Sequence, residues 1–398
     1  MPTLTENTHS LLRLTMAPGL GPRRIASMVE LFGSATAALA ASPAEMARIR
    51  GIGTITAAKI ARGLRESMEL AEREIEHAER LGVIFLGIGE PGYPPLLATI
   101  PDPPPILSVL GELRPETDDR YPAAIVGSRA CTSYGLEQAE RFASILAGSG
   151  ITIVSGGARG IDSAAHRGAM RSNGRTIAVL GCGLAHRYPP ENAALFEEIA
   201  DGRGALVSEL PLDVSPQADN FPARNRIISG LALGVVVIEA AKGSGALITA
   251  RAAAEDQGRE VLAVPGRVDS PASEGTHTLI KAGGAALATG PGDVLELLET
   301  PARHHFVGTH EPRYADATAT EPVGLWAGEG EPTTNHSQPT PSDPLQKRLL
   351  DILDRARTPD DLATRLGVGP AEVRTAITML EIQGLIGRRG SLIERRQR

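Results

Sequence analysis

A glycine-rich segment near the middle of the chain carries a basic residue and has the composition of a phosphate-binding loop. It contains Gly127, Ser128 and Arg129 and leads, from Thr132, into a helical pattern. Glycine lets backbone N–H groups approach an anion, and the first turn of a helix leaves such groups without partners. A guanidinium adds charge and two parallel donors. We therefore predict that Gly127, Ser128 and Arg129 form an anion site.

A second segment of the same kind follows at residues 155–162, which read SGGARGID. Its glycines, Gly157 among them, expose backbone amides, and Arg159 again supplies a guanidinium. Asp162 is placed to cap the helix that carries His166. The sequence thus predicts a second anion cradle, formed by Gly157 and Arg159, beside the first.

An aromatic residue stands close to basic residues in NFPARNRII, residues 220–228. A ring at Phe221 suits a stacked base, while Arg224 and its neighbour Asn225 are suited to the phosphates of the same strand. The alternative is that Phe221 is a core residue. Further on, Lys242 and Ser244 lie in a Gly/Ser-rich turn before a helix, and the lysine offers a point charge.

The same loops lack the motifs of common enzymes. We find no GxxxxGK[ST], no GxSxG and no HExxH. Asp162 and His166 share a helical face and could be an acid and a base, but a cap and a hydrogen-bonded packing histidine are the simpler interpretation. Cys131 and Cys182 lack CxxC or Cys/His spacing, which indicates buried thiols. We expect no catalytic residue, no metal and no cofactor.

The elements that position these loops are short apolar segments alternating with helical patterns. The expected buried strands are 123–126, 151–154, 176–180, 205–207, 235–238 and 261–264. This alternation is typical of right-handed βαβ units and predicts an α/β domain with a mostly parallel sheet and helices on both faces. Two further strands, 83–86 and 106–110, joined by a turn, would extend one edge. Ligands of such sheets bind outside the carboxyl ends of the strands, where all the candidate loops lie.

Composition divides the chain into four parts: 1–81, 82–300, 301–343 and 344–398. The first part holds two helix–turn–helix patterns whose turns read GLG, at 19–21, and GIG, at 51–53. They resemble the helix-hairpin-helix fold, which binds DNA phosphates; a helical module for protein contacts is the alternative. The third part has the composition of a flexible linker and contains Trp326, a stray apolar residue or an interaction spot. The last part resembles a winged helix, with residues 372–383 as recognition helix.

Overall charge constrains the type of site. The chain has 398 residues and a formal net charge of -7, so it has no general attraction for polyanions, and a nucleic-acid site would need cations gathered in one cleft. Arg129, Arg159, Arg224, Arg226 and Lys242 all follow expected strands and meet that condition. No segment has the length and apolarity of a membrane span, and the first residues lack a signal-peptide pattern, so we expect a cytoplasmic protein with no membrane partner.

Seven motifs occur in order: GSR, SGGARGID, YPPEN, FPARNRIISGL, GSGALITARAA, AVPG and EGTHTLIKAGGA. This series is similar to that of the DNA processing protein A family, also called Smf. The resemblance implies an extended Rossmann-like, doubly wound domain that binds single-stranded DNA and is not an enzyme. It also implies that the protein forms a homodimer and loads the RecA recombinase onto incoming DNA in natural transformation.

The family's DNA-binding residues correspond to three places in this sequence. Arg129, beside Ser128, takes the place of a phosphate ligand, and Phe221 that of the stacking ring, with Arg224 and Asn225 beside it. Lys242 is the basic residue after the fifth strand. The sequence departs from the family at Asp219, whose charge would repel a phosphate next to Phe221.

Two other functions stay open. The sheet also resembles nucleotide-binding phosphoribohydrolases of the lysine-decarboxylase-like class, although the glutamate of their PGGxGTxxE signature is missing here. Alternatively, the winged helix could read duplex DNA as a regulator, with five arginines near the carboxyl end against one glutamate. These residues are Arg388, Arg389, Arg395, Arg396, Arg398 and Glu394. A solvated tail or a protein contact is the simpler interpretation of that charge.

Residues 188–192, YPPEN, are expected to have a structural role.

Overall fold

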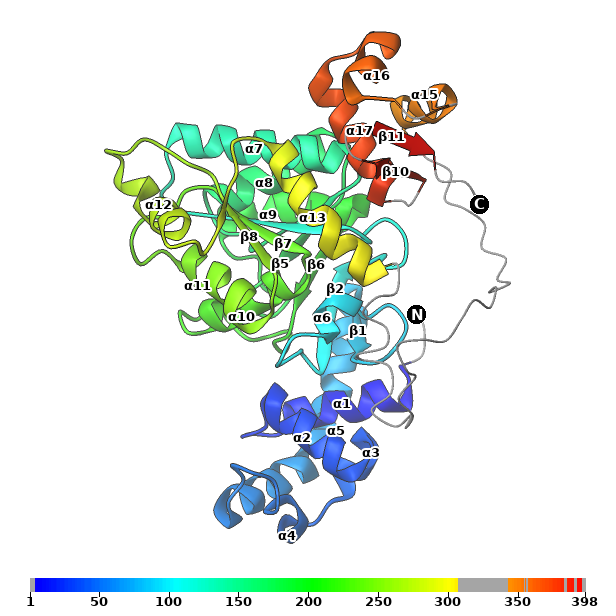
Figure 1. The fold of residues 1–398 in the computed structure, drawn as a ribbon. Helices are drawn as coiled ribbons and strands as arrows, with labels where there is room; N and C mark the ends of the chain where they lie inside the picture. The colour runs from blue at the N-terminus through cyan, green and yellow to red at the C-terminus, as the bar shows by residue number, and fades with distance from the viewer. Residues whose placement is uncertain are drawn as a thin grey trace. The chain divides into compact units, whose positions relative to one another are not determined.

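The computed structural model describes residues 4–306, 343–353, 355, 357–382, 385–389 and 392–395. The chain divides into two compact units, Met1–Pro291 and Gly292–Arg398 (Figure 1). The first unit contains the helical amino-terminal part and the α/β part predicted at 82–300 as far as Pro291, so residues 292–300 fall in the second unit. The second contains the winged helix.

Five helices form the amino-terminal part, and they include the two predicted hairpins. They are α1 (Glu6–Met16), α2 (Pro22–Phe32), α3 (Ala35–Ala40), α4 (Pro43–Met46) and α5 (Thr54–Leu81). Gly19 and Gly51 have φ angles of 90° and 84°, which side chains disfavour, and both precede the helix of their hairpin. The Arg24 guanidinium donates to both turns, to the Gly19 carbonyl at 2.7 Å and the Gly51 carbonyl at 3.2 Å. One side chain thus ties the two hairpins together.

A nine-stranded sheet forms the centre of the first unit. Its strands are β1 (Val83–Gly87), β2 (Ile106–Gly111), β3 (Pro122–Val126), β4 (Thr152–Ser155), β5 (Thr176–Val179), β6 (Gly204–Ser208), β7 (Gly234–Val237), β8 (Glu260–Ala263) and β9 (Ala286–Leu287). Their spatial order is β1-β2-β6-β5-β4-β3-β7-β8-β9. Strands β3 to β9 pair in parallel, whereas β2 pairs antiparallel with both β1 and β6. The predicted mostly parallel sheet with an added edge is confirmed.

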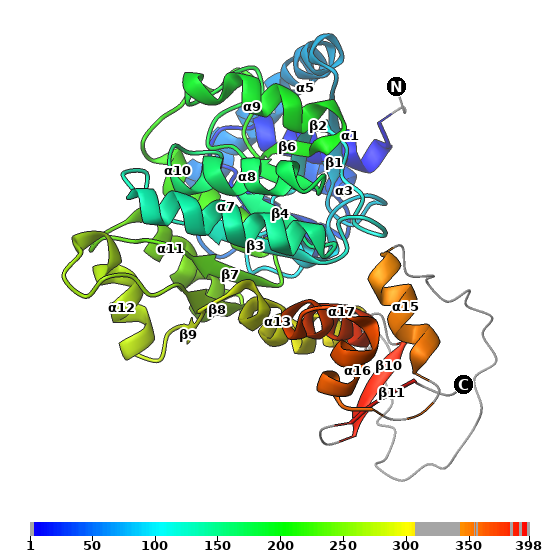
Figure 2. The same cartoon turned by 90° about the horizontal axis from the view of Figure 1, so that it is seen from above.

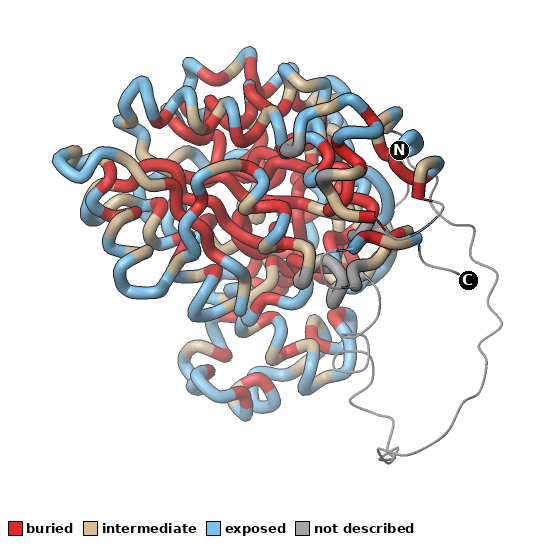
Figure 3. The backbone as a smooth tube through the Cα atoms, turned by 45° about the horizontal axis from the view of Figure 1, so that its top comes forward, coloured by how far each residue is buried: buried red, intermediate tan, exposed pale blue. Residues whose placement is uncertain are grey.

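The strands are buried because their apolar side chains are covered on both faces. All five residues of β3 are buried, as are all four of β7. Figure 3 shows this buried core as a continuous band through the sheet. The covering helices are α6 (Pro95–Ala98), α7 (Ser133–Gly148), α8 (Ile161–Arg171), α9 (Ala193–Glu198), α10 (Asn220–Gly230), α11 (Gly245–Arg251) and α12 (Glu274–Lys281). Short 3-10 or π turns are Pro190–Asn192, Ile199–Arg203, Ala252–Asp256 and Pro271–Ser273.

The chain winds outward from β3 in both directions, and this creates the position for a ligand. After β3 the strands β4, β5 and β6 are added on one side, and β7, β8 and β9 on the other. Helices α7, α8 and α9 lie on one face of the sheet and α10 and α11 on the opposite face (Figures 1 and 2). Between β3 and β7 the loops leave toward opposite faces. In doubly wound sheets, ligands bind at this switch point.

Three local predictions need correction. The segment between β1 and β2 contains the short helix α6 rather than a turn alone, and the edge strand β9 was not predicted. Strand β9 has only two residues, both exposed, so it lacks an apolar pattern. The helix α13 (Pro291–Phe306) continues past residue 301, where the linker was expected to begin. The rest of that linker, with Trp326, lies outside the described residues.

The second unit has the elements of a winged helix. Helices α15 (Pro344–Ile352), α16 (Pro359–Leu366) and α17 (Pro370–Ile382) are followed by the antiparallel strands β10 (Ile386–Arg389) and β11 (Leu392–Arg395). Its own core forms where the three helices and both strands meet, around residues such as Leu349, Leu362, Ile377 and Ile386. The predicted three helices and two wing strands are confirmed; Arg396 and Arg398 lie outside the described residues.

No helix among the described residues has both the length and the apolarity needed to span a bilayer.

Candidate nucleic-acid interface

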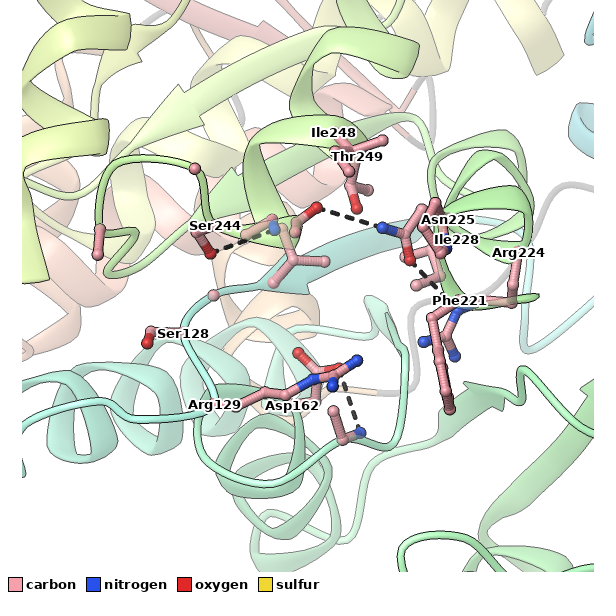
Figure 4. Close-up of a pocket in the computed structure, with 18 of the residues that line it drawn as sticks. Ser128, Arg129, Asp162, Phe221, Arg224, Asn225, Ile228, Ser244, Ile248 and Thr249 are labelled. Carbon is pink, nitrogen blue, oxygen red and sulfur yellow. Dashed lines mark hydrogen bonds between the residues drawn. The ribbon is translucent and has the colours of Figure 1, made fainter. Parts of the chain in front are cut away.

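A cleft of about 710 Å³ opens at the switch point between β3 and β7. The loops after β3 and β7 and the first turns of α10 and α11 form its walls. Of the ten predicted site residues, eight line it: Gly127, Ser128, Arg129, Phe221, Arg224, Asn225, Lys242 and Ser244. Figure 4 shows the Arg129 side chain and the Phe221 ring facing this space from different elements. The structure thus brings together loops that are more than one hundred residues apart in the sequence.

The carboxylate of Glu239 holds the loop after β3 in place. Glu239 is the second residue after β7 and is 4% exposed. Its carboxylate accepts hydrogen bonds from the Thr132 N–H at 2.8 Å and the Thr132 hydroxyl at 2.6 Å, and its backbone carbonyl accepts from the Ser128 N–H at 2.7 Å. A side chain at Gly135 would collide with this carboxylate. Glycine is therefore required at the start of α7, a feature that the GSR motif does not predict.

Phe221 is half-buried and lies in the first turn of α10, where it lines the cleft, rather than on a loop. The ring lies close to Gly181, where a Cβ atom would stand 2.7 Å from the ring edge. The Arg129 guanidinium carbon lies 5.1 Å from the ring centroid, a cation–π distance. Phe221 is therefore not a fully buried core residue, and stacking of a ligand on its ring stays a prediction.

Tyr188 is a second ring at the cleft, and sequence reasoning missed it. Its centroid is 5.8 Å from that of Phe221, with the planes tilted by 40°, and it lines the same cleft. From its sequence, the whole YPPEN segment is expected to be structural. That interpretation holds for Asn192, whose amide donates to the Gly157 carbonyl at 2.9 Å and to the Ser163 hydroxyl at 3.0 Å. Tyr188 could have been recognised from the sequence as an aromatic residue in the loop that follows the carboxyl end of β5.

Two cations in the cleft are free to meet a phosphate. Arg129 and Lys242 are exposed, and neither side chain makes an ion pair or hydrogen bond within the described part of the chain; the Arg129 guanidinium contacts the Phe221 ring. They come from the two loops that flank the switch point. Asp162 is the acidic side chain among the lining residues, and it is buried. The accessible charge of the cleft is therefore positive although the whole chain is acidic.

Arg224 and Asn225 line the cleft, but their side chains donate to backbone carbonyls of the protein. Arg224 is 5% exposed, and its guanidinium donates to the carbonyls of Gly156, at 2.7 Å, and Val179. Burial lowers the pKa of Arg224 to about 10, an effect that the nearby Asp162 opposes, so the group stays charged at neutral pH. The Asn225 amide donates to the Gly245 carbonyl at 3.2 Å and so links α10 to the start of α11.

The second predicted cradle is divided between the surface and the core. Gly157 is buried and does not line the cleft; its φ of 67° and its contact with the Phe196 ring require glycine there. Arg159 is exposed and lies beside a second, shallow hollow whose lining includes Arg129, Tyr188 and Phe221. Its guanidinium is paired with Glu191, at 3.1 Å from Nε and 2.5 Å from Nη2.

Arg226 does not belong to the gathered cations, contrary to the prediction. It is absent from the lining of the cleft and makes ion pairs with Glu209 at 2.6 Å and Asp102 at 3.1 Å. Because α10 is a helix, Arg224 and Arg226 project from different faces, which a loop would not have required. The exposed Asp219 precedes α10 and is also absent from the lining of the cleft.

Asp162 and His166 do not form an acid–base pair. The residue before α8 is Gly160, so Asp162 is not the cap; its carboxylate accepts from the Ala158 N–H at 3.2 Å, and burial raises its pKa. The fully buried His166 bonds through Nδ1 to the Thr176 hydroxyl at 2.7 Å. Since that hydroxyl donates to the Ile153 carbonyl, Nδ1 carries the proton. Nε2 has no partner, so the histidine is only half satisfied.

The described residues contain no group of three or more His, Cys, Asp or Glu side chains placed to hold a metal ion. Both cysteines are free thiols. Cys182 is buried, as predicted, whereas Cys131, in the loop after Arg129, is only partly covered.

These features define a class: a doubly wound α/β protein with a cation-lined cleft and two aromatic rings at its switch point. Comparison with known proteins narrows the class. Residues 84–299 match the family of the DNA recombination-mediator protein A, residues 332–390 the DprA winged-helix domain, and residues 11–66 the SAM-like helix-hairpin-helix tandem. The chain belongs to the DNA processing protein A (DprA/Smf) family.

Relatives cover most of the chain. Protein Smf of Escherichia coli is 43% identical over 74% of this chain and 72% of its own length. Protein Smf of Synechocystis is 36% identical over 94% of this chain and 95% of its own. The crystal structure of DNA processing protein A from Streptococcus pneumoniae aligns with a TM-score of 0.65 and 34% identity, covering 74% of this chain and 98% of that one.

Proposed function

We propose that this protein binds single-stranded DNA, without changing it chemically, in the cleft between β3 and β7. The observation that carries the proposal is the Arg129 guanidinium 5.1 Å from the centre of the half-exposed Phe221 ring, in a cleft with Lys242 on its rim. A ring can stack on an unpaired base, and the cations can neutralise the phosphates on either side of it. In a duplex the bases are stacked on one another and cannot reach a ring inside a cleft.

The family's description as a recombination mediator supports a further step. We propose that the protein acts as a homodimer and passes the bound strand to the RecA recombinase, as its resemblance to the DNA processing proteins implies. Asp162 and Glu239, the two buried carboxylates near the cleft, are engaged, Asp162 by a backbone N–H and Glu239 by Thr132. The exposed Glu191 carboxylate is paired with Arg159. This favours a binding protein over a phosphoribohydrolase, whose chemistry needs an available carboxylate.

The first expected result is a preference for single strands that needs no nucleotide cofactor. Two free cations predict a slope of log K against log salt of about -1.4, at about -0.7 per phosphate contact on a single strand. Fluorescence anisotropy with a labelled oligo-dT and with a matched duplex, at several salt concentrations, measures both quantities. Equal affinity for the duplex would point to the winged helix instead, and deletion of residues 344–398 would then abolish binding. Release of free base from a nucleoside monophosphate would instead indicate the enzyme.

Removing either free cation should weaken binding and reduce its salt dependence. Arg129→Ala and Lys242→Ala each remove one phosphate contact, so each slope should become less negative by about 0.7. Arg251→Ala is a matched control, because Arg251 is an exposed arginine on α11 that is absent from the lining of the cleft. If both cleft variants bind single strands as tightly as the wild type, the DNA site lies elsewhere.

A further inference from the structure

The ion pair between Arg159 and Glu191 occupies a cation that lies next to the proposed DNA path. Nε and Nη2 of Arg159 both approach one Glu191 oxygen, at 3.1 and 2.5 Å. These two donors form one edge of the guanidinium, the edge that would hold a phosphate oxygen. The carboxylate therefore occupies the position that an oxygen of DNA would take. Arg159 lowers the pKa of the Glu191 carboxyl, which is accordingly charged at neutral pH.

The position of this pair makes it reachable from the main cleft. The shallow hollow beside Arg159 and the main cleft share five lining residues, and the shared wall includes Arg129, Tyr188 and Phe221. A strand that stacks on the rings and extends past them arrives at Arg159. Both partners are open to solvent, with side chains 53% and 59% exposed, so no other group has to move for the pair to separate.

The carboxylate is held in place by its neighbour in the chain. Glu191 belongs to the short helical turn Pro190–Asn192. The buried Asn192 amide donates to the carbonyls of Gly157, at 2.9 Å, and Ala158, at 3.3 Å, in the same loop that carries Arg159. The two charged side chains thus project from segments that are hydrogen-bonded to each other, and Glu191 remains close after it releases Arg159.

Building on the proposed function, we propose that Glu191 is a built-in competitor of the DNA phosphate for Arg159, and that Arg159 is a third phosphate contact made only when this carboxylate is displaced. The carboxylate that remains nearby repels the phosphate and cancels the charge of Arg159. The contact therefore adds almost nothing to the salt dependence of the wild type. DNA strands that are too short to extend beyond the Tyr188 and Phe221 rings do not reach Arg159.

The test is the charge-removing, shape-conserving variant Glu191→Gln. It should bind a long oligo-dT about 1.5- to 5-fold more tightly at low salt, the range of an exposed ion pair. Its salt slope should become more negative by about 0.7. The gain should vanish for the shortest oligo-dT that still binds. It should also vanish in the double variant Arg159→Gln/Glu191→Gln.

Glu69→Gln is the matched control, because Glu69 also pairs with an exposed arginine, Arg73 on α5, and the change adds the same net charge at a residue that lines neither hollow. Equal affinity and slope for Glu191→Gln, Glu69→Gln and the wild type would overturn the proposal. A gain that persists without Arg159 would overturn it as well. If instead Arg129→Ala and Lys242→Ala bind normally, the proposed DNA site itself is wrong, and the role of Glu191 falls with it.

Discussion

Phe221→Ala should weaken single-stranded DNA binding by about 1 to 3 kcal/mol, roughly 5- to 150-fold in dissociation constant. The loss should come without a change in salt slope, because the ring neutralises no phosphate. A lower affinity with an unchanged salt slope distinguishes Phe221→Ala from Arg129→Ala and Lys242→Ala, which change both the affinity and the slope. Anisotropy titrations of the same oligo-dT at several salt concentrations measure affinity and slope together.

Two further variants separate stacking from packing. Phe221→Leu keeps an apolar side chain against Gly181 but removes the aromatic face, so its affinity should stay low. Phe221→Tyr keeps the face and should retain most of the affinity. Thermal melting of each variant shows whether the fold is intact. Wild-type affinity for Phe221→Leu would mean that the ring serves packing and that bases stack elsewhere.

Acid should destabilise the α/β unit through His166. Burial lowers the pKa of this histidine to about 3 from an ordinary value of 6.5, so the folded unit keeps it neutral while the unfolded chain binds a proton. The folded-state pKa is depressed, so this stability is fully present above pH 6.5. It is lost as the pH falls, by about 1.4 kcal/mol per pH unit. The loss reaches about 2 kcal/mol at pH 5 and about 5 kcal/mol near pH 3.

His166→Asn isolates this contribution, because an asparagine amide can donate to Thr176 as Nδ1 does and does not titrate. Denaturant unfolding followed by circular dichroism from pH 7.5 to pH 5 gives the free energy of unfolding of both proteins. The difference between them should change by about 2 kcal/mol over this range. Parallel pH profiles would show that the imidazole is protonated in the folded unit or that the surrounding core opens to admit water.

The architecture was largely predictable because it is repeated along the chain. Each buried strand reads as an apolar segment, such as 123–126 or 235–238, and each is followed by a glycine-containing loop and a helical pattern. Strand β9 escaped because two exposed residues have no periodicity, and α6 because it is a single turn with prolines at its start. The place of β9 at the sheet edge depends on its pairing with β8, and a local sequence pattern does not show such a pairing.

The location of the candidate site was predictable from the sequence, but the contacts made by its side chains were less so. Glycines and basic residues after the strands marked the loops, and topology brought those loops together. Burial then divided the arginines: Arg129 remains free, Arg224 is committed to carbonyls and Arg226 to two carboxylates. These distinctions follow from the helical turn of α10 and from acidic residues more than fifteen positions away. Tyr188 was missed for the same reason, since its neighbour Phe221 is distant in sequence.

The anchoring of the loop after β3 by Glu239 has a thermodynamic consequence for the proposed DNA complex. The three hydrogen bonds from Ser128 and Thr132 are made within the protein alone. The conformational entropy of this loop is therefore lost when the polypeptide folds, not when a polynucleotide arrives. In the proposed complex, a preorganised rim would leave the flexible nucleic acid as the partner that must lose freedom, so most of the ordering cost of association would fall on the DNA.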